Sequence, residues 1–165
     1  MTGHRKQNSM RRIAPKLIVF LASGGGAGFS PYFPGTLGTL VGIPVSLAVN
    51  RLAAITPTWA IFTLLGLTLI GIGLADRAAQ ILAKKDPAAV VIDEIAGFAL
   101  ANFLSSSMTG LILAFVLFRF FDIAKVFPAA QLEALPGGAG IVLDDIMAGL
   151  YTFLILRLLA NANLV

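Results

Sequence analysis

Five of the eight acidic residues lie within or beside strongly apolar sequence, namely Asp93, Glu94, Asp122, Asp144 and Asp145. A carboxylate in or near lipid is costly unless it gathers with other polar groups in a shared site. Only Arg119 and Lys125 lie close to these acids along the chain, so negative charge is in excess. A purely structural network of ion pairs would leave that excess uncompensated. A divalent metal ion would compensate it, which predicts a metal site built from these five acids.

The available side chains restrict both the metal and the chemistry. The chain has no cysteine, and its single histidine, His4, lies in a polar basic tail. Hard oxygen ligands without Cys or a usable His favour Mg²⁺, or Mn²⁺, over zinc. The same absences exclude cysteinyl-phosphate and phosphohistidine intermediates. Catalysis must therefore come from carboxylates, cations, hydroxyls and backbone groups.

Arg119, Asp122 and Lys125 are spaced three residues apart and fit on one helix face. Successive members of such a series are about 60° apart, so the face is about 120° wide. Two intrahelical ion pairs would explain the spacing. Alternatively, the acid holds a metal ion while the two cations hold an anionic substrate. A metal beside two cations is typical of a site for a phosphate group.

The loop from Phe29 to Thr39 has the composition of an anion cradle. Its prolines fix the chain, its glycines allow close backbone approach, and the N-terminus of a helix follows. The loop lacks the Gly-Lys-Ser/Thr of a P-loop, and a plain structured turn is the other interpretation.

The composition indicates the elements that must position these residues. Hydrophobic residues make up 58% of the 165, charged residues only 12%, and the mean hydropathy is +0.90. Ordinary domains carry about 25% charged residues. This composition excludes disorder and predicts an all-α integral membrane bundle. We expect a single domain over residues 1–165, with about 4–5 membrane-embedded helices and a short N-terminal segment.

Residues 1–16 contain a basic cluster, which we interpret as a cytoplasmic tail that orients the protein. No aromatic residues interleave with it, which disfavours a nucleic-acid partner. The expected segments are a short apolar run at 17–22, a loop at 23–35, and helices at about 36–51, 58–84 and 141–165. Thr36 could cap the first of these long helices. Residues 128–140, rich in Pro and Gly, are expected to form a cytoplasmic loop.

The stretch 88–127 is either one span or two helices joined by a turn at 105–110. We prefer the turn, because it brings Asp93, Glu94, Asp122 and Lys125 to the same side of the membrane. The segments Val91–Ile95 and Val142–Ile146 are similar, because each places two adjacent acids in apolar sequence. Gly97 and Gly149 follow about one turn later and would let a neighbouring helix approach closely.

Taken together, these motifs resemble the bacterial phosphatidylglycerophosphatase A family, in the family's order and over most of residues 28–150. The matching segments are Ser30-Pro31, Pro34-Gly35-Thr36, Gly38-Thr39, Pro44, Asp86-Pro87, Asp93-Glu94, Gly97, Phe118-Arg119, Phe121-Asp122, Lys125, Gly137-Gly138, Gly140-Ile141, Asp144-Asp145 and Ala148-Gly149. One departure is Val126, which follows Lys125 where family members usually have proline.

The resemblance implies a Mg²⁺-dependent lipid phosphatase of phospholipid biosynthesis. It would convert phosphatidylglycerophosphate to phosphatidylglycerol in the bacterial cytoplasmic membrane. We expect a multi-pass protein whose site faces the cytoplasm, where a headgroup can reach it while the acyl chains stay in the bilayer. The sequence does not define the oligomeric state.

Metal-activated water is the expected nucleophile, with an aspartyl nucleophile as the alternative. Asp93, Asp122, Asp144 and Asp145 would bind metal, and Glu94 would be a further ligand or the general base. Arg119 and Lys125 would neutralise the phosphate, while Gly35, Thr36 and Thr39 would orient it. A small ion-coupled transporter is the rival interpretation, because intramembrane acids and a Gly/Pro-broken segment would suit it. The motif pattern of CDP-alcohol phosphotransferases is not present around Asp144.

Overall fold

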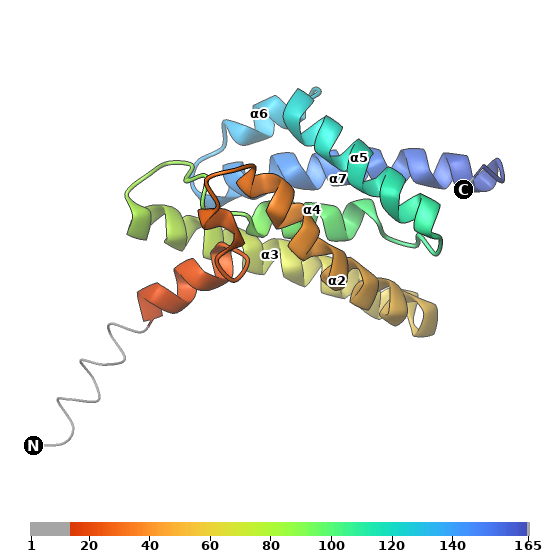
Figure 1. The fold of residues 1–165 in the computed structure, drawn as a ribbon, viewed down its shortest axis with the longest axis horizontal. Coiled ribbons are helices and arrows are strands. Elements are labelled where there is room, and N and C mark those ends of the chain that lie inside the picture. Colours follow the sequence, from red (N-terminus) through yellow and green to blue (C-terminus); the bar gives the residue numbers. More distant parts are fainter. Residues whose placement is uncertain (1–13, 165) are drawn as a thin grey trace, which may run out of the picture.

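The structure, a computed structural model, describes residues 14–164, and every regular element in this range is a helix (Figure 1). Residues 14–22 form a short helix, followed by η1 (Ala27–Phe29), α2 (Pro34–Ile55), α3 (Pro57–Leu82), α4 (Ile92–Ala101), α5 (Met108–Ala124), α6 (Ala129–Glu133) and α7 (Gly138–Asn161). His4 and most of the predicted basic tail lie outside the described residues.

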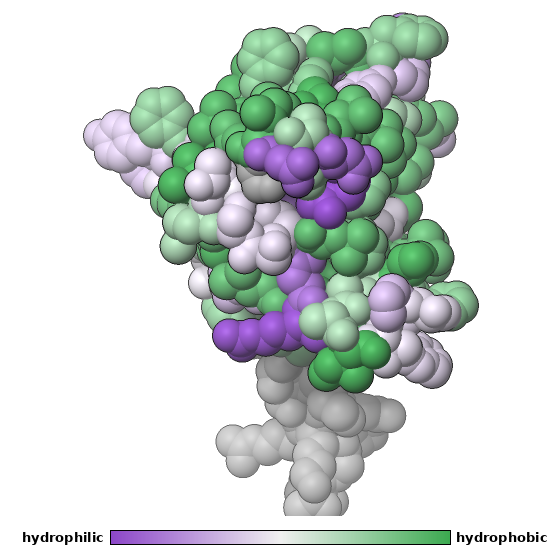
Figure 2. All heavy atoms as spheres, turned by 90° about the vertical axis from the view of Figure 1, so that its right-hand side faces the viewer, coloured by the Kyte–Doolittle hydropathy of each residue, from purple (hydrophilic) through white to green (hydrophobic). Residues whose placement is uncertain are grey.

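Helices α2, α3 and α7 are long and apolar enough to cross a membrane, since about 20 apolar residues suffice. Large apolar side chains point outward from them, including Phe62, Leu69 and Leu158, which are more than half exposed. The face shown in Figure 2, which is the right-hand end of the bundle in Figure 1, is mostly apolar, with hydrophilic residues in small groups. An apolar surface of this kind suits contact with lipid. The predicted all-α membrane bundle is therefore confirmed.

The helices run broadly along the long axis of the molecule, so the bundle has two ends (Figure 1). At one, here called the charged end, α2, α4 and α7 begin and α3 and α5 finish. At the other, the distal end, lie the α2–α3 and α4–α5 turns. Residues 88–127 therefore form two helices, as the hairpin interpretation expected. The hairpin returns the end of α5 to the beginning of α4.

Glycines let the central helix α4 lie very close to both α2 and α7. A Cβ atom built on Gly38 of α2 would lie 2.6 Å from the Cβ of Val91, just before α4. A Cβ on Gly97 of α4 would lie 2.7 Å from the carbonyl oxygen of Asp145, and one on Gly149 of α7 would collide with the Gly97 carbonyl. Small residues at crossings are a common way for membrane helices to approach. This contact brings the acid pair of α4 beside that of α7.

Several helix boundaries differ from the predicted ones for local reasons. Helix α2 begins at Pro34 rather than near Thr36, with Phe33 as its N-cap residue. Proline suits the first helical position, where an N–H would have no intrahelical partner. Helix α7 begins at Gly138, before the predicted Ile141, and Asp76 of α3 accepts a hydrogen bond from the Gly138 amide (3.3 Å). The predicted loop at 128–140 contains α6.

The distal end is held by amide side chains. Asn50 of α2 donates to the carbonyl oxygens of Asn102 (2.8 Å) and Ser105 (3.0 Å), and it accepts from the Leu104 amide (2.8 Å). Asn102, which is fully buried, donates to the Ser46 hydroxyl (3.0 Å). These bonds fasten the α4–α5 turn to α2. They satisfy turn backbone that would otherwise be unpaired next to lipid.

Candidate active site

A cavity of about 520 Å³ opens at the charged end of the bundle. Its polar lining consists of Gly35, Thr36, Lys85, Asp86, Asp93, Glu94, Arg119, Asp122, Lys125, Glu133, Asp144 and Asp145. All the site residues expected from the sequence therefore line it, except Thr39. The lining comes from the first turn of α2, the α3–α4 loop, α4, the end of α5, α6 and α7.

Three of the five acids form a compact group. One carboxylate oxygen each from Asp93, Glu94 and Asp145 lies within 4.8 Å of the others. Glu94 Oε2 and Asp145 Oδ2 are buried and have no hydrogen-bond partner, and the Asp145 residue is only 4% exposed. Buried carboxylates without partners are strongly unfavourable. A hard divalent cation would satisfy these oxygens and compensate their charge, so the donor set fits Mg²⁺.

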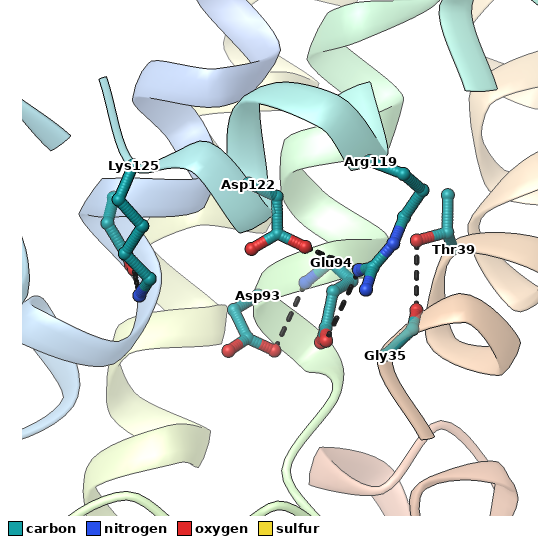
Figure 3. A network of polar contacts seen from close by, with 8 residues as sticks. Gly35, Thr39, Asp93, Glu94, Arg119, Asp122 and Lys125 are labelled. Atoms are coloured by element: carbon teal, nitrogen blue, oxygen red, sulfur yellow. Dashed lines mark hydrogen bonds and ion pairs between the residues drawn. The ribbon is translucent and has the colours of Figure 1, made fainter. Parts of the chain in front are cut away.

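Arg119 lies between two of the acids (Figure 3). Its Nη1 atom is 2.5 Å from Asp122 Oδ2 and 3.8 Å from Glu94 Oε1. Neither contact has the geometry of a hydrogen bond. The buried Nε and Nη1 atoms therefore lack a hydrogen-bond acceptor. The guanidinium is thus held in position by charge while two of its nitrogens still lack an acceptor. An arginine in this condition is suited to bind a phosphate through its planar fork.

Lys125 holds the opposite side of the cavity. Its Nζ atom is 2.6 Å from Asp144 Oδ2 and 3.0 Å from Glu133 Oε2. Burial alone would lower the pKa of Lys125, but hydrogen bonds and charge attraction from Asp144 and Glu133 outweigh it and raise the pKa. The ammonium group therefore keeps its proton at any pH where the protein would work. It is a permanent positive charge, linked to α6 through Glu133.

Asp122 and Asp144 thus differ from the other three acids. Each pairs with a cation, Asp122 with Arg119 and Asp144 with Lys125. Asp144 still has a buried oxygen, Oδ1, without a partner. The sequence predicted metal binding for Asp93, Asp122, Asp144 and Asp145 together, with Glu94 as a further ligand or the general base. The geometry instead separates a group of three acids from two that pair with the cations.

Gly35 lets the first turn of α2 lie directly against the Glu94–Arg119 pair. A Cβ atom there would collide with the Glu94 carboxylate and lie 3.0 Å from Arg119 Nη1. Thr36 follows it on the cavity wall. Thr39 is fully buried one turn deeper, and its hydroxyl donates to the Gly35 carbonyl (2.9 Å; Figure 3). Thr39 therefore supports the turn, and its predicted contact with phosphate is untested.

Three charged residues of the cavity, Lys85, Asp86 and Glu133, were given no role at the site by the sequence. In the sequence, Lys85 is a positive charge that follows a predicted helix, and Glu133 lies in a predicted loop that contains no site motif. Lys85 and Asp86 come from the α3–α4 loop and Glu133 ends the short helix α6, and the place of all three at the cavity depends on the fold. No local spacing in the sequence could have indicated it.

Comparison with known proteins gives a consistent result. The family model described as phosphatidylglycerophosphatase A matches residues 20–160. A Haemophilus influenzae phosphatidylglycerophosphatase A is 36% identical over 141 residues, covering 84% of this chain and 85% of the relative. The Escherichia coli phosphatidylglycerophosphatase A is 33% identical over 135 residues, covering 78% and 75%.

A third relative carries a different name. A Bacteroides thetaiotaomicron protein, provisionally described as a phosphatidylinositol-3-phosphatase, is 34% identical over 146 residues, covering 85% of this chain and 91% of the relative. No solved structure matches the chain.

Proposed function

Because the chain belongs to the phosphatidylglycerophosphatase A family, we propose that it hydrolyses the terminal phosphomonoester of phosphatidylglycerophosphate. The products are phosphatidylglycerol and phosphate. The observation that carries the proposal is the gathering of an acidic group, Arg119 and Lys125 around one cavity at the end of a membrane bundle. Family membership also favours an enzyme over the ion-coupled transporter.

The acidic group would hold the metal. Asp93 and Asp145 are the proposed ligands for Mg²⁺, or Mn²⁺, with Glu94 beside them and Asp122 and Asp144 at the edge of the site. When bound, the ion would supply Lewis-acid charge stabilisation and a water of lowered pKa. The support from the protein is the set of buried carboxylate oxygens that lack partners.

The cations would bind the phosphate that is to be released. Arg119 offers nitrogens without an acceptor, and Lys125 offers a fixed positive charge from the other side. Both would stabilise the negative charge on the phosphate oxygens as the ester bond breaks. The first-turn amides of α2, at Gly35 and Thr36, are suited to bind a third oxygen, because such amides have no intrahelical acceptor.

Glu94 is the proposed general base. It faces both the acidic group and Arg119, and its Oε2 atom has no hydrogen-bond partner. In this role it would accept a proton from the attacking water, while Asp93 and Asp145 remain as ligands. Asp122 would keep Arg119 oriented, since its carboxylate is the nearer partner of that guanidinium.

We further propose a multi-pass topology in the bacterial cytoplasmic membrane, with the cavity facing the cytoplasm. Lys16, Arg77, Lys84 and Lys85 lie in elements near the charged end, whereas Arg51 and Arg157 lie near the distal end. Lysine and arginine are enriched on the cytoplasmic side of membrane proteins. Residues 1–165 would then form one membrane-embedded phosphatase domain.

Phosphatidylinositol 3-phosphate is the second candidate substrate, because of the Bacteroides relative. Purified full-length protein in mixed micelles should be assayed for phosphate release from both lipids, matched in acyl chains. We expect phosphatidylglycerophosphate to be hydrolysed with the higher kcat/KM, and Asp122→Asn to reduce hydrolysis of it at least tenfold. Faster release from the inositol lipid, or none from phosphatidylglycerophosphate, would contradict the proposal.

A further inference from the structure

The cavity wall carries three cations, and two of them are already engaged by acids. Arg119 pairs with Asp122 and Glu94, and Lys125 with Asp144 and Glu133. Lys85, the third, forms no ion pair within the described residues 14–164. The adjacent Asp86 also lines the cavity without pairing with it. Lys85 is therefore the only one of these three cations whose charge is not compensated by an acid within residues 14–164.

The backbone around Lys85 is anchored, although its side chain is exposed. Before it, the Lys84 amide donates to the Ala79 carbonyl (3.1 Å) at the end of α3. After it, the Val90 amide donates to the carbonyl of buried Pro87 (2.8 Å), and the Val91 amide to that of Ala22 (2.9 Å). These bonds hold the α3–α4 loop at the rim of the cavity. The backbone on both sides of Lys85 is therefore fixed, while its exposed side chain lines the cavity apart from the Arg119 and Lys125 ion pairs.

The proposed substrate carries two phosphates joined by a glycerol. The terminal monoester is the group cleaved, and the diester beside the lipid retains one negative charge. A cavity of about 520 Å³ falls within the ~300–1,000 Å³ typical of small-molecule sites, so it has room beyond one phosphate. If Arg119 and Lys125 bind the monoester, Lys85 is the remaining cation of the cavity lining that can meet the diester.

We infer that Lys85 binds the diester phosphate of the headgroup and is a specificity-determining residue of the cavity. The inference rests on the proposed function, and it extends that function by naming the second anionic group that is recognised. Lys85 is a binding residue only, with no part in bond breaking. Its loss should therefore raise KM and leave kcat nearly unchanged.

Lys84 provides a matched control. It is adjacent to Lys85, equally charged, exposed and at the same end of the bundle, but it does not line the cavity. Phosphate release from phosphatidylglycerophosphate should be measured for full-length wild type, Lys85→Glu, Lys85→Arg and Lys84→Glu. We expect Lys85→Glu to raise KM about tenfold, with Lys85→Arg and Lys84→Glu within about twofold of wild type.

Two inhibitors separate recognition of the diester from a general effect of charge. Inorganic phosphate resembles only the phosphate monoester, which Arg119 and Lys125 would bind. The deacylated headgroup, glycerophosphoglycerophosphate, carries both the monoester and the diester. Lys85→Glu should weaken inhibition by the deacylated headgroup several-fold more than inhibition by inorganic phosphate.

Equal KM values for Lys85→Glu and Lys84→Glu, or equal weakening of both inhibitors, would overturn the inference while leaving the proposed function intact. A wild-type protein that does not hydrolyse phosphatidylglycerophosphate would overturn the proposed function, and the role of Lys85 with it.

Discussion

The two ends of the bundle differ in how their buried polar groups are paired, although Asn102 Oδ1 at the distal end also lacks a partner. At the distal end, the side-chain nitrogen of Asn50 donates to the backbone of the α4–α5 turn, and its side-chain oxygen accepts from that backbone. At the charged end, Glu94, Asp144 and Asp145 each retain a buried oxygen without a partner. Neutral amides hold the first end together, whereas the second gathers like charges that repel one another.

This difference separates structure from function within a single small protein. Satisfied polar groups stabilise a fold, whereas unsatisfied ones cost stability and persist where a ligand completes them. Glycine contacts between α4 and α7 force the acids together at the charged end despite that cost. Changes at the charged end should therefore affect catalysis more than stability, and changes at the distal end should do the reverse.

The largest expected effect is that of Asp145→Asn. It removes a charge from the acidic group while preserving shape, so phosphate release should fall by about 10³-fold, in line with several kcal/mol of lost charge stabilisation. Without metal, its thermal stability should equal or exceed that of wild type, because a buried repulsion is relieved. A large loss of stability would instead show that Asp145 belongs to a structural network.

Gly35→Ala should give an intermediate effect. The added methyl group would collide with the Glu94 carboxylate and press on Arg119. Displacing these groups by a fraction of an ångström should lower kcat/KM by about 10- to 100-fold.

Gly66→Ala in α3 is the matched control, because a Cβ there meets nothing within 4 Å. That change should leave activity unaltered, since the new methyl group touches no other part of the chain. Equal activity of the two alanine variants would mean that Glu94 and Arg119 need no such positioning.

Asn50→Ala should have the smallest effect on activity and a clear one on stability. It leaves the carbonyls of Asn102 and Ser105 and the amide of Leu104 without their partner. We expect a loss of about 1–3 kcal/mol in the free energy of unfolding, measured by denaturation in detergent. Catalysis in the folded fraction should change less than twofold, and a greater change would remove the distinction between the two ends.

Much of the charged end could be predicted from sequence, because lipid permits few arrangements of so many acids. The hairpin at 88–127 followed from requiring Asp93 and Asp122 to share a side, and the structure has that hairpin. Which acids would group together and which would pair with a cation could not be predicted. Whether an acid faces another acid or a cation depends on helix rotation, which is fixed by contacts such as Gly97 against Asp145.

One further difference has a local origin, and two depend on helix packing. Thr39 faces its own helix because its hydroxyl can reach the carbonyl four residues earlier, a bond open to any helical threonine. Lys85 and Glu133 reach the cavity from connections whose course depends on the packing of the helices they join. The spacing of residues along one helix shows which side chains share a face of that helix. It does not show which other segments of the chain pack beside that face.

Direct measurement of metal binding tests the central claim, that the charged end is a metal-binding catalytic site. Mn²⁺ binding to detergent-solubilised full-length protein can be followed by electron paramagnetic resonance, independently of activity. We predict saturable binding to wild type and to Asn50→Ala, and binding to Asp145→Asn weakened at least tenfold. Absence of binding to wild type, or equal binding to all three proteins, would contradict the account.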